Sequence, residues 1–333
     1  MWPMRCSLVL VVVAVLSAGV AGPSQAQSPT KTARIGILTG ASLSTPVNAY
    51  HREAFVEALR QLGWAEGKNL ILEARGTEGK PELFAEYAAE LVGLKVDVAV
   101  GPNSQAVQAL KDKTSSIPIV MLDVSHPVEA GFVASLARPG GNITGVTSQI
   151  NEVSAKALEL LREVKPGIGR IGVLYTPSNA GSALAIKEAL ETIPKRLGVS
   201  LVPVPIDRAI DIDAAFALID REGLHALQVH PTPVINTNRV RIAALLSERR
   251  VATVTPFSTL VREGILMSYG PDQVESWRGA ASYVDRILRG AKPADLPVEQ
   301  PTKFLIVLNL RTAKAIGVEF TPELLTRADE LIE

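Results

Sequence analysis

The chain has 333 residues, of which 47% are hydrophobic and 20% are charged, and its 34 basic residues balance its 34 acidic ones. This composition is typical of a folded globular protein and excludes the highly charged, weakly hydrophobic class of disordered chains. No run of basic residues concentrates positive charge, so neither nucleic acid nor an anionic membrane surface is an expected partner.

The N-terminal 26 residues have the pattern of a removable export signal. Arg5 precedes an apolar run at residues 8–16, and small residues follow up to Ala26, as signal peptidase requires. A single membrane-spanning helix is the alternative, but the apolar run is shorter than the roughly 20 residues that cross a bilayer. Cys6 lies before the run, so it is not the lipidated residue of a lipoprotein. We expect cleavage near Ala26 and a periplasmic protein that is not a lipoprotein.

Removal of residues 1–26 leaves about 307 residues, which is long for one hydrophobic core and suits two domains. The first half alternates short apolar runs with amphipathic stretches, and this alternation predicts a parallel sheet with helices on both faces. We expect strands at residues 33–38, 70–73, 96–100 and 117–122, and helices at residues 47–62, 83–91 and 128–137.

The same alternation begins again after a run of helix breakers at residues 138–142. We expect helices at residues 154–164, 182–197, 213–221 and 235–249, and strands at residues 170–175, 200–204, 226–229 and 252–254. The fold class is therefore α/β, with two doubly wound parallel-sheet units. A last helix at residues 274–288 and a strand at residues 304–308 should return to the two units. We expect an N-terminal lobe of residues 31–147 plus about 272–300, and a C-terminal lobe of residues 148–271 plus about 301–333.

Catalytic motifs are scarce in this sequence. It has no nucleophile elbow, phosphate-binding loop or His-Glu-x-x-His pair, and no cysteine remains after signal cleavage. The four histidines have no spacing typical of metal ligands. The glycine pattern at residues 167–172 precedes a strand instead of joining a strand to a helix, so we interpret it as a turn. We expect no metal, no cofactor and no enzymatic activity; a secreted α/β enzyme is the alternative, for which no nucleophile and base can be paired.

Polar and aromatic residues recur where the predicted strands end. In parallel sheets, ligands bind beyond the carboxyl ends of the strands, where helix N-termini can receive an anionic group. Helix capping is the alternative role for each serine or asparagine. Two facing lobes would place these side chains around a cleft suited to a small zwitterionic or aromatic solute. The candidate ligand-binding residues are Ser42, Ser44, Asn103, Ser104, His126, Tyr175, Asn179, Thr232, Phe257 and Ser258.

Four segments have a recognisable pattern: residues 126–146, which include His126-Pro127-Val128 and Arg138-Pro139-Gly140-Gly141-Asn142, the run Ser268-Tyr269-Gly270-Pro271-Asp272, residues 287–302, and Arg327-Ala328-Asp329. These segments resemble the ABC transporter substrate-binding protein family of the tryptophan/tyrosine type. The resemblance implies a type I periplasmic binding fold, in which two Rossmann-like lobes joined by a hinge clamp a solute. It also implies an ABC permease and its ATPase as partners.

The resemblance further implies roles for individual residues. Ser42 and Ser44 match the first ligand loop, Asn103 and Ser104 match the second, and the wall from the other lobe is matched by Asn179, Thr232 and Ser258. His126 stands where relatives usually have the aspartate of Asp-Pro-Val, which weakens or reverses the charge preference of that position if it faces the cleft.

From these observations we expect a monomeric periplasmic solute-binding component of an ABC importer, with a small amino-acid-like or aromatic ligand. The alternative is an extracytoplasmic sensor that passes a closed-lobe signal to a membrane kinase or chemoreceptor, since the same scaffold serves both roles.

Overall fold

The computed structural model describes Met1, residues 32–42 and residues 46–333, without the side chains of residues 46–48, 150–152 and 180. Residues 2–26 of the predicted export signal, and Ser44, lie outside the described residues. Among the helices that are described, none combines the length and the apolar character needed to cross a bilayer. Residues Thr32–Glu333 form one compact unit that contains two separate sheets.

The first sheet is entirely parallel, in the order β2-β1-β3-β4-β5. Its strands are short and apolar because helices bury both of its faces. They are β1 (Ala33–Thr39), β2 (Leu70–Gly76), β3 (Val98–Gly101), β4 (Ile119–Val124) and β5 (Ile143–Thr147). The sequence predicted the first four of these strands, and β5 is an addition.

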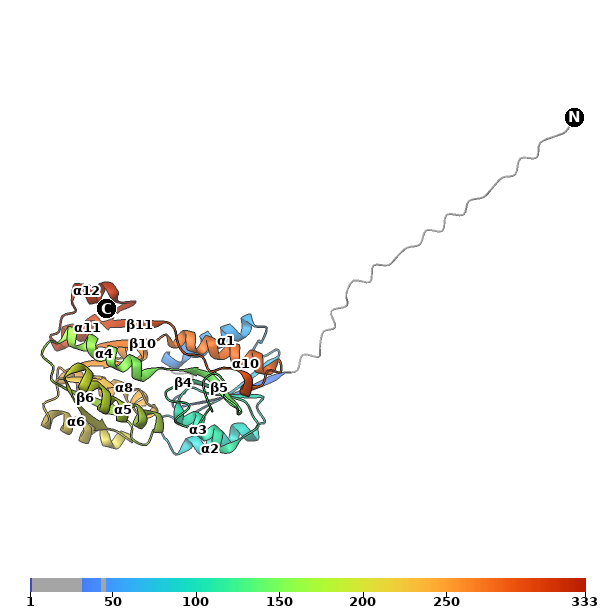
Figure 1. Cartoon of the computed structure of the whole chain (residues 1–333), viewed down its shortest axis with the longest axis horizontal. Coiled ribbons are helices and arrows are strands. Elements are labelled where there is room, and N and C mark those ends of the chain that lie inside the picture. The colour runs from blue at the N-terminus through green and yellow to red at the C-terminus, as the bar shows by residue number, and fades with distance from the viewer. Residues whose placement is uncertain (2–31, 43–45) are drawn as a thin grey trace. The chain divides into compact units, whose positions relative to one another are not determined.

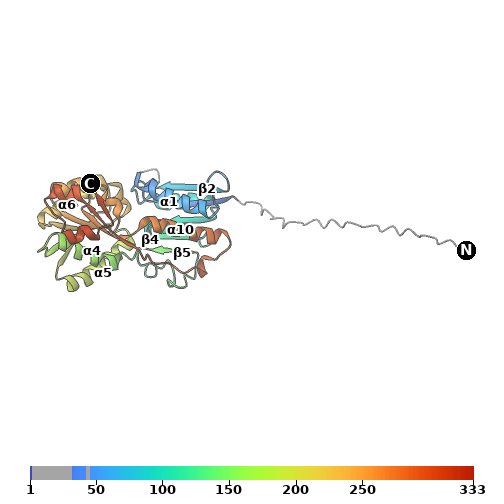
Figure 2. The same cartoon turned by 90° about the horizontal axis from the view of Figure 1, so that it is seen from above.

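Two pairs of helices cover this sheet. One face packs against α1 (Pro46–Gln61) and α10 (Gln273–Leu288), and the other against α2 (Leu83–Gly93) and α3 (Ser104–Lys113). The α1 and α10 helices lie side by side, although more than 200 residues of sequence separate them (Figures 1 and 2). Phe55 of α1 and Tyr283 of α10 are fully buried in their shared core.

The second sheet has the order β12-β11-β10-β9-β8-β6-β7 and is parallel except where β10 pairs with β11. Its inner strands continue the strand-helix alternation, whereas β11 and β12 extend the edge. The strands are β6 (Arg170–Tyr175), β7 (Ser200–Pro205), β8 (Ala226–Val229), β9 (Ala252–Thr255), β10 (Met267–Pro271), β11 (Phe304–Asn309) and β12 (Glu330–Ile332).

The helices of the second sheet also divide between its faces (Figure 1). One core includes residues of α4 (Ile150–Val164), α5 (Ala180–Leu197), α11 (Leu310–Ile316) and α12 (Pro322–Arg327). The opposite core includes residues of α6 (Ile212–Arg221), α7 (Pro233–Thr237), α8 (Arg239–Glu248) and α9 (Ser258–Val261). The predicted fold class of two doubly wound sheets is therefore confirmed.

The chain passes between the two sheets after β5, after β10 and before β11. Because α10 packs on the first sheet while β11 extends the second, both sheets take in C-terminal residues. We propose the division expected from the sequence: residues 31–147 with about 272–300 as the first lobe, and residues 148–271 with about 301–333 as the second.

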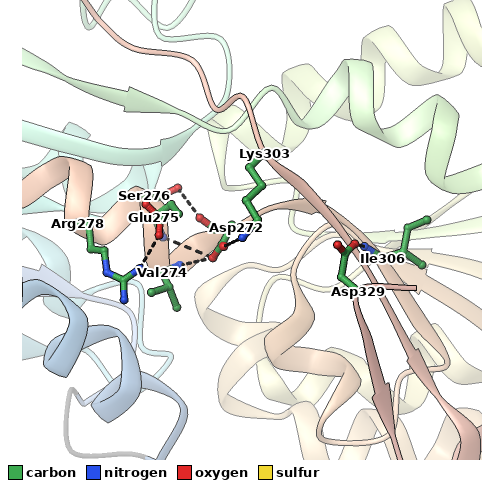
Figure 3. Close-up of polar contacts among 8 residues, drawn as sticks. All are labelled: Asp272, Val274, Glu275, Ser276, Arg278, Lys303, Ile306 and Asp329. Carbon is green, nitrogen blue, oxygen red and sulfur yellow. Dashed lines mark hydrogen bonds and ion pairs between the residues drawn. The ribbon is translucent and has the colours of Figure 1, made fainter. Parts of the chain in front are cut away.

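Asp272 joins two of these crossings (Figure 3). Its side chain caps α10 by accepting hydrogen bonds from the backbone N–H groups of Val274 and Glu275. Its other carboxylate oxygen lies 3.1 Å from Lys303 Nζ in the crossing that leads to β11. The Asp272 side chain both caps α10 and pairs with Lys303, so it connects the start of α10 to the neighbouring crossing between the two sheets.

Two predicted helices differ from the structure. Residues 128–137 form turns instead of a helix, because Gly131 takes a left-handed conformation with φ of +68° and ends the helical hydrogen bonding. Residues 235–249 are not continuous, since α7 and α8 are separated at Asn238. The Asn238 side chain donates to the Val234 carbonyl at 2.8 Å and so competes with the backbone.

Candidate functional site

A cavity of about 140 Å³ lies between the carboxyl ends of the two sheets. The first lobe lines it with residues that follow β1 and β3, with the end of β4, and with residues of α1 and α10. The second lobe lines it with residues that follow β6, β8 and β9. Both sheets thus direct their strand ends, where parallel sheets bind ligands, into one space.

Two helices, one from each lobe, begin at this cavity. Asn103 caps α3 and Asn179 caps α5, and each asparagine side chain accepts a 2.9 Å hydrogen bond from an N–H in the first turn of its helix. The two helix ends approach closely, since a Cβ added to Gly181 would lie 2.5 Å from Ser104 Oγ. The positive ends of two helix dipoles therefore meet at the cavity, where they favour an anionic group such as a carboxylate.

Aromatic side chains form an apolar part of the wall. The Trp277 ring of α10 is 3% exposed and stacks on His51 with 6.1 Å between ring centroids and 14° between ring planes. Phe55 supports Trp277 from within the core by an edge contact at 5.7 Å. Phe257, which follows β9, lines the cavity from the second lobe. These rings suit an apolar or aromatic portion of a ligand.

Two histidines line the cavity in their neutral form. Burial lowers the pKa of His51 to about 4, although the nearby Asp272 carboxylate acts in the opposite direction. Burial also lowers the pKa of His230 to about 4. The Nε2 atom of His230 is buried and has no hydrogen-bond partner among the described residues. Both rings therefore offer a ligand hydrogen-bonding nitrogens and no charge near neutral pH.

One cation and one carboxylate line the same space. Arg239 Nε lies 3.0 Å from Glu263 Oε1, so its charge is balanced within the second lobe. Asp123, at the end of β4, accepts a 3.1 Å hydrogen bond from Gln273 Nε2 of α10. In the described part of the chain, no cation forms an ion pair with Asp123. Its carboxylate is therefore the charge in the cavity that the described residues do not balance.

The structure brings half of the sequence-predicted site residues together. Those that line the cavity are Asn103, Ser104, Asn179, Thr232 and Phe257. Four others are not among its lining residues: Ser42, His126, Tyr175 and Ser258. Ser44 lies outside the described residues. The binding roles of all ten remain predictions.

His126 lies beside acidic side chains instead of the cavity. Its Nε2 is 3.5 Å from Glu188 Oε2 of α5, and its Nδ1 is 3.9 Å from Glu129 Oε2. Because Glu188 belongs to the second lobe, this contact spans the two lobes. His126 is therefore part of a contact between the two lobes in this structure.

Sequence reasoning missed several lining residues that belong to helices. His51 and Trp277 lie within α1 and α10, so the strand-end pattern could not select them. Gln273 is the first residue of α10 and follows β10, a strand that was not expected from the sequence. Asp123 and His230 do lie at strand ends, and an ionisable side chain directly after an apolar run is the signal that could have singled them out. In the described chain, no three His, Cys, Asp or Glu side chains are grouped closely enough to hold a metal ion.

A family model described as ABC transporter substrate binding protein matches residues 36–332, which is most of the chain. The chain belongs to this family. The predicted resemblance is confirmed, and a member of this family is a solute-binding protein.

Individual relatives support the same placement. The chain is 25% identical over 268 residues to a tyrosine-binding protein of Clostridioides difficile strain R20291, which covers 80% of this chain and 76% of that protein. A conserved domain protein from Vibrio cholerae O1 biovar eltor has a similar structure, with a TM-score of 0.82, 27% identity, and coverage of 90% of this chain and 100% of the other.

A domain from Streptococcus pneumonia, solved in complex with L-Trp, also has a TM-score of 0.82. It is 23% identical and covers 91% of this chain and 100% of that one, so it supports the fold alone. The predicted type I periplasmic binding fold of this substrate-binding protein is thereby confirmed.

Proposed function

We propose that this substrate-binding protein is the receptor of an ABC importer and binds a small amino-acid-like or aromatic solute in the cavity between its lobes. The observation that supports this most is the junction of two helix N-termini, one from each lobe, beside the Trp277 ring. A solute with an anionic end and an apolar body would touch both lobes at once. Such a ligand stabilises the closed arrangement, because only contacts made in that state shift the population toward it.

Two names among the relatives agree with this solute class. One relative is a tyrosine-binding protein, and a structural neighbour holds L-Trp. We extend this class to the present chain because an aromatic amino acid carries both a carboxylate for the helix ends and a ring for the aromatic wall.

The remaining parts of the proposal concern location and partners. We propose export by a signal cleaved near Ala26, action as a periplasmic monomer, and delivery of the solute to a membrane permease and its ATPase.

We also propose that the protein is not an enzyme. Among the described residues, neither His51 nor His230 is hydrogen-bonded to a serine or threonine hydroxyl of the cavity, so no activated nucleophile supports catalysis.

Calorimetric titration of the purified mature protein tests the ligand class. We expect L-tyrosine, L-tryptophan or L-phenylalanine to bind with a Kd of about 10 μM or tighter, a free energy near −7 kcal/mol. Sugars and polyols serve as the comparison panel. Binding of a sugar or polyol, with no binding of any amino acid, would contradict the proposed solute class.

Transport is tested by comparing uptake of the bound solute in cells with and without this protein. We expect uptake to fall when the protein is absent. Equal uptake in both would contradict the importer role.

Intrinsic fluorescence offers a test of where the solute binds. The mature chain has two tryptophans: Trp277 lines the cavity, whereas Trp64 donates from Nε1 to Asp285 at 2.8 Å outside it. We expect Trp64→Phe to keep the change in emission that the ligand causes, and Trp277→Phe to lose most of it. Loss of the larger ring should also weaken affinity about 2- to 10-fold. A ligand signal that follows Trp64 instead would place the binding site elsewhere.

A further inference from the structure

Asp123 owes its position to an irregularity in β4. The pairing of β4 with β5 shifts between Met121 and Val124, and Asp123 itself takes a left-handed conformation with φ of +48°. Met121 and Val124 both belong to the core that α3 covers. Asp123 therefore departs from the in-and-out alternation of the strand, as residues in β-bulges do, and its carboxylate reaches α10 at the edge of the cavity.

The carboxylate of Asp123 is only partly satisfied by the protein. Its Oδ2 accepts the hydrogen bond from Gln273 Nε2, but its Oδ1 is buried and has no partner among the described residues. Burial raises the pKa of Asp123 to about 6, while the hydrogen bond from Gln273 and the nearby Ser276 hydroxyl oppose that rise. Asp123 nevertheless keeps some accessible surface, and it lines the cavity. A ligand in the cavity would cover that surface.

Gln273 adds a second unused acceptor beside Asp123. Because its Nε2 donates to the carboxylate, its Oε1 is defined as an acceptor, and this atom is buried without a partner. A left-handed non-glycine residue, a bulge and two unsatisfied acceptors are each unfavourable for the protein alone. Their coincidence at one point of a ligand cavity indicates that a donor-rich group of the ligand completes the site.

We propose that Asp123 binds a protonated amine of the solute and thereby selects solutes that carry one, with Gln273 Oε1 as a second acceptor for its N–H groups. This inference rests on the proposed function, since it assumes a solute in this cavity. An ammonium group supplies several N–H donors and the missing positive charge together. A hydroxyl group could donate to the same atoms, but it would leave the buried negative charge unbalanced. The amine sits at Asp123, and the anionic end of the solute sits at the helix N-termini.

The first experiment compares matched ligands that differ only in the amine. Calorimetry would measure L-tyrosine against 3-(4-hydroxyphenyl)propionate, and L-tryptophan against indole-3-propionate. We expect each amino acid to bind at least about 30-fold more tightly than its partner, as for the loss of one member of a buried charge pair. Equal or tighter binding of the compounds without the amine overturns the assignment of Asp123 and leaves the proposed function standing. Failure of every compound to bind overturns both.

The second experiment changes the receptor. Asp123→Asn keeps the shape of the side chain and an acceptor for Gln273 but removes the charge. We expect it to lower affinity for the amino acid at least about 30-fold and to leave affinity for the compound without the amine within about 3-fold. Asp112→Asn, on the exposed end of α3, makes the same charge change away from the cavity and should retain wild-type affinity. Equal losses for both ligands in Asp123→Asn would mean that Asp123 only maintains the shape of the site.

A pH series on the wild-type protein gives an independent readout, even if Asp123→Asn does not fold. Protonation makes the Asp123 carboxyl neutral, so affinity for the amino acid should be about tenfold lower at about pH 5 than near pH 7.5. The two histidines of the cavity hold one state over this range, because burial lowers the pKa of His51 and of His230 to about 4. Affinity that does not change over this range overturns the proposal.

Discussion

Replacement of Gly40 by Ala should weaken solute binding about 10- to 100-fold, because it holds the lobes apart. Gly40 follows β1 in the first lobe and faces Pro233 of the second. A Cβ at Gly40 would lie 2.5 Å from Pro233 Cβ and 2.7 Å from its Cγ, which is closer than real carbon atoms approach. Pro233 is the first residue of α7, and its ring is rigid, so it cannot move aside. The added methyl group must therefore push the lobes apart.

The same substitution should leave each lobe folded. The backbone of Gly40 is not in the left-handed region, so alanine introduces no local strain there. We therefore expect the melting temperature of the ligand-free protein to change by less than about 4 °C, while calorimetry reports the loss of affinity. Gly93→Ala is the matched control, because a Cβ at Gly93 meets nothing within 4 Å. Wild-type affinity in Gly40→Ala would show that binding does not depend on this close approach of the lobes.

Replacement of Tyr283 by Ala should destabilise the protein by about 3 to 5 kcal/mol, which is typical of removing a large aromatic side chain from a core. Tyr283 is fully buried on α10, and the Arg286 guanidinium lies over its ring at 4.1 Å from the centroid. Its hydroxyl donates to the carbonyl of Pro297. The segment that contains Pro297 runs beside β5, where Glu299 bridges to Val146. Tyr283 therefore joins α10 to the last part of the chain that belongs to the first lobe.

Urea unfolding followed by circular dichroism measures this loss. Tyr283→Phe keeps the ring and removes only the hydroxyl, so we expect a smaller cost of about 1 to 2 kcal/mol. Burial, reinforced by the Glu299 charge, raises the pKa of the phenol to about 12, so the hydroxyl remains a donor at all pH values in ordinary use. Tyr50→Ala, at an exposed position on α1, should change stability by less than about 0.5 kcal/mol. A cost below about 1 kcal/mol for Tyr283→Ala would contradict the role assigned to this contact.

The fold was largely predictable because strand and helix periodicity is a local property of the sequence. Apolar runs such as residues 33–38 and 170–175 became strands within one residue of the expected bounds. The errors occurred where a single side chain or backbone angle overrode the pattern. Asn238 interrupts an amphipathic stretch where its side chain donates to the Val234 carbonyl, and Gly131 ends a helical pattern with a left-handed turn. Neither effect changes the periodicity of hydrophobic residues, so the pattern could not reveal it.

The candidate site was predictable only in its strand-end part. Asn103 and Asn179 were selected because they precede helices that start after strands, and both line the cavity. His126 was selected by the same logic, yet the structure places it against Glu188. Trp277 could not be selected, because its role depends on α10 returning to a sheet whose strands lie more than 120 residues earlier.

By itself, the sequence determined the α/β class, the repeated doubly wound pattern, the family and the strand ends at which a ligand would bind. These follow from local hydrophobic periodicity, from turn residues and from motifs that are contiguous in the chain. Only the tertiary structure decided which strand ends face each other, that α10 brings Trp277 and Gln273 to the cavity, and that Asp123 leaves the strand alternation beside them. Those features depend on contacts between residues far apart in sequence, and the burial that changes the chemistry of Asp123 exists only once α10 packs beside the end of β4.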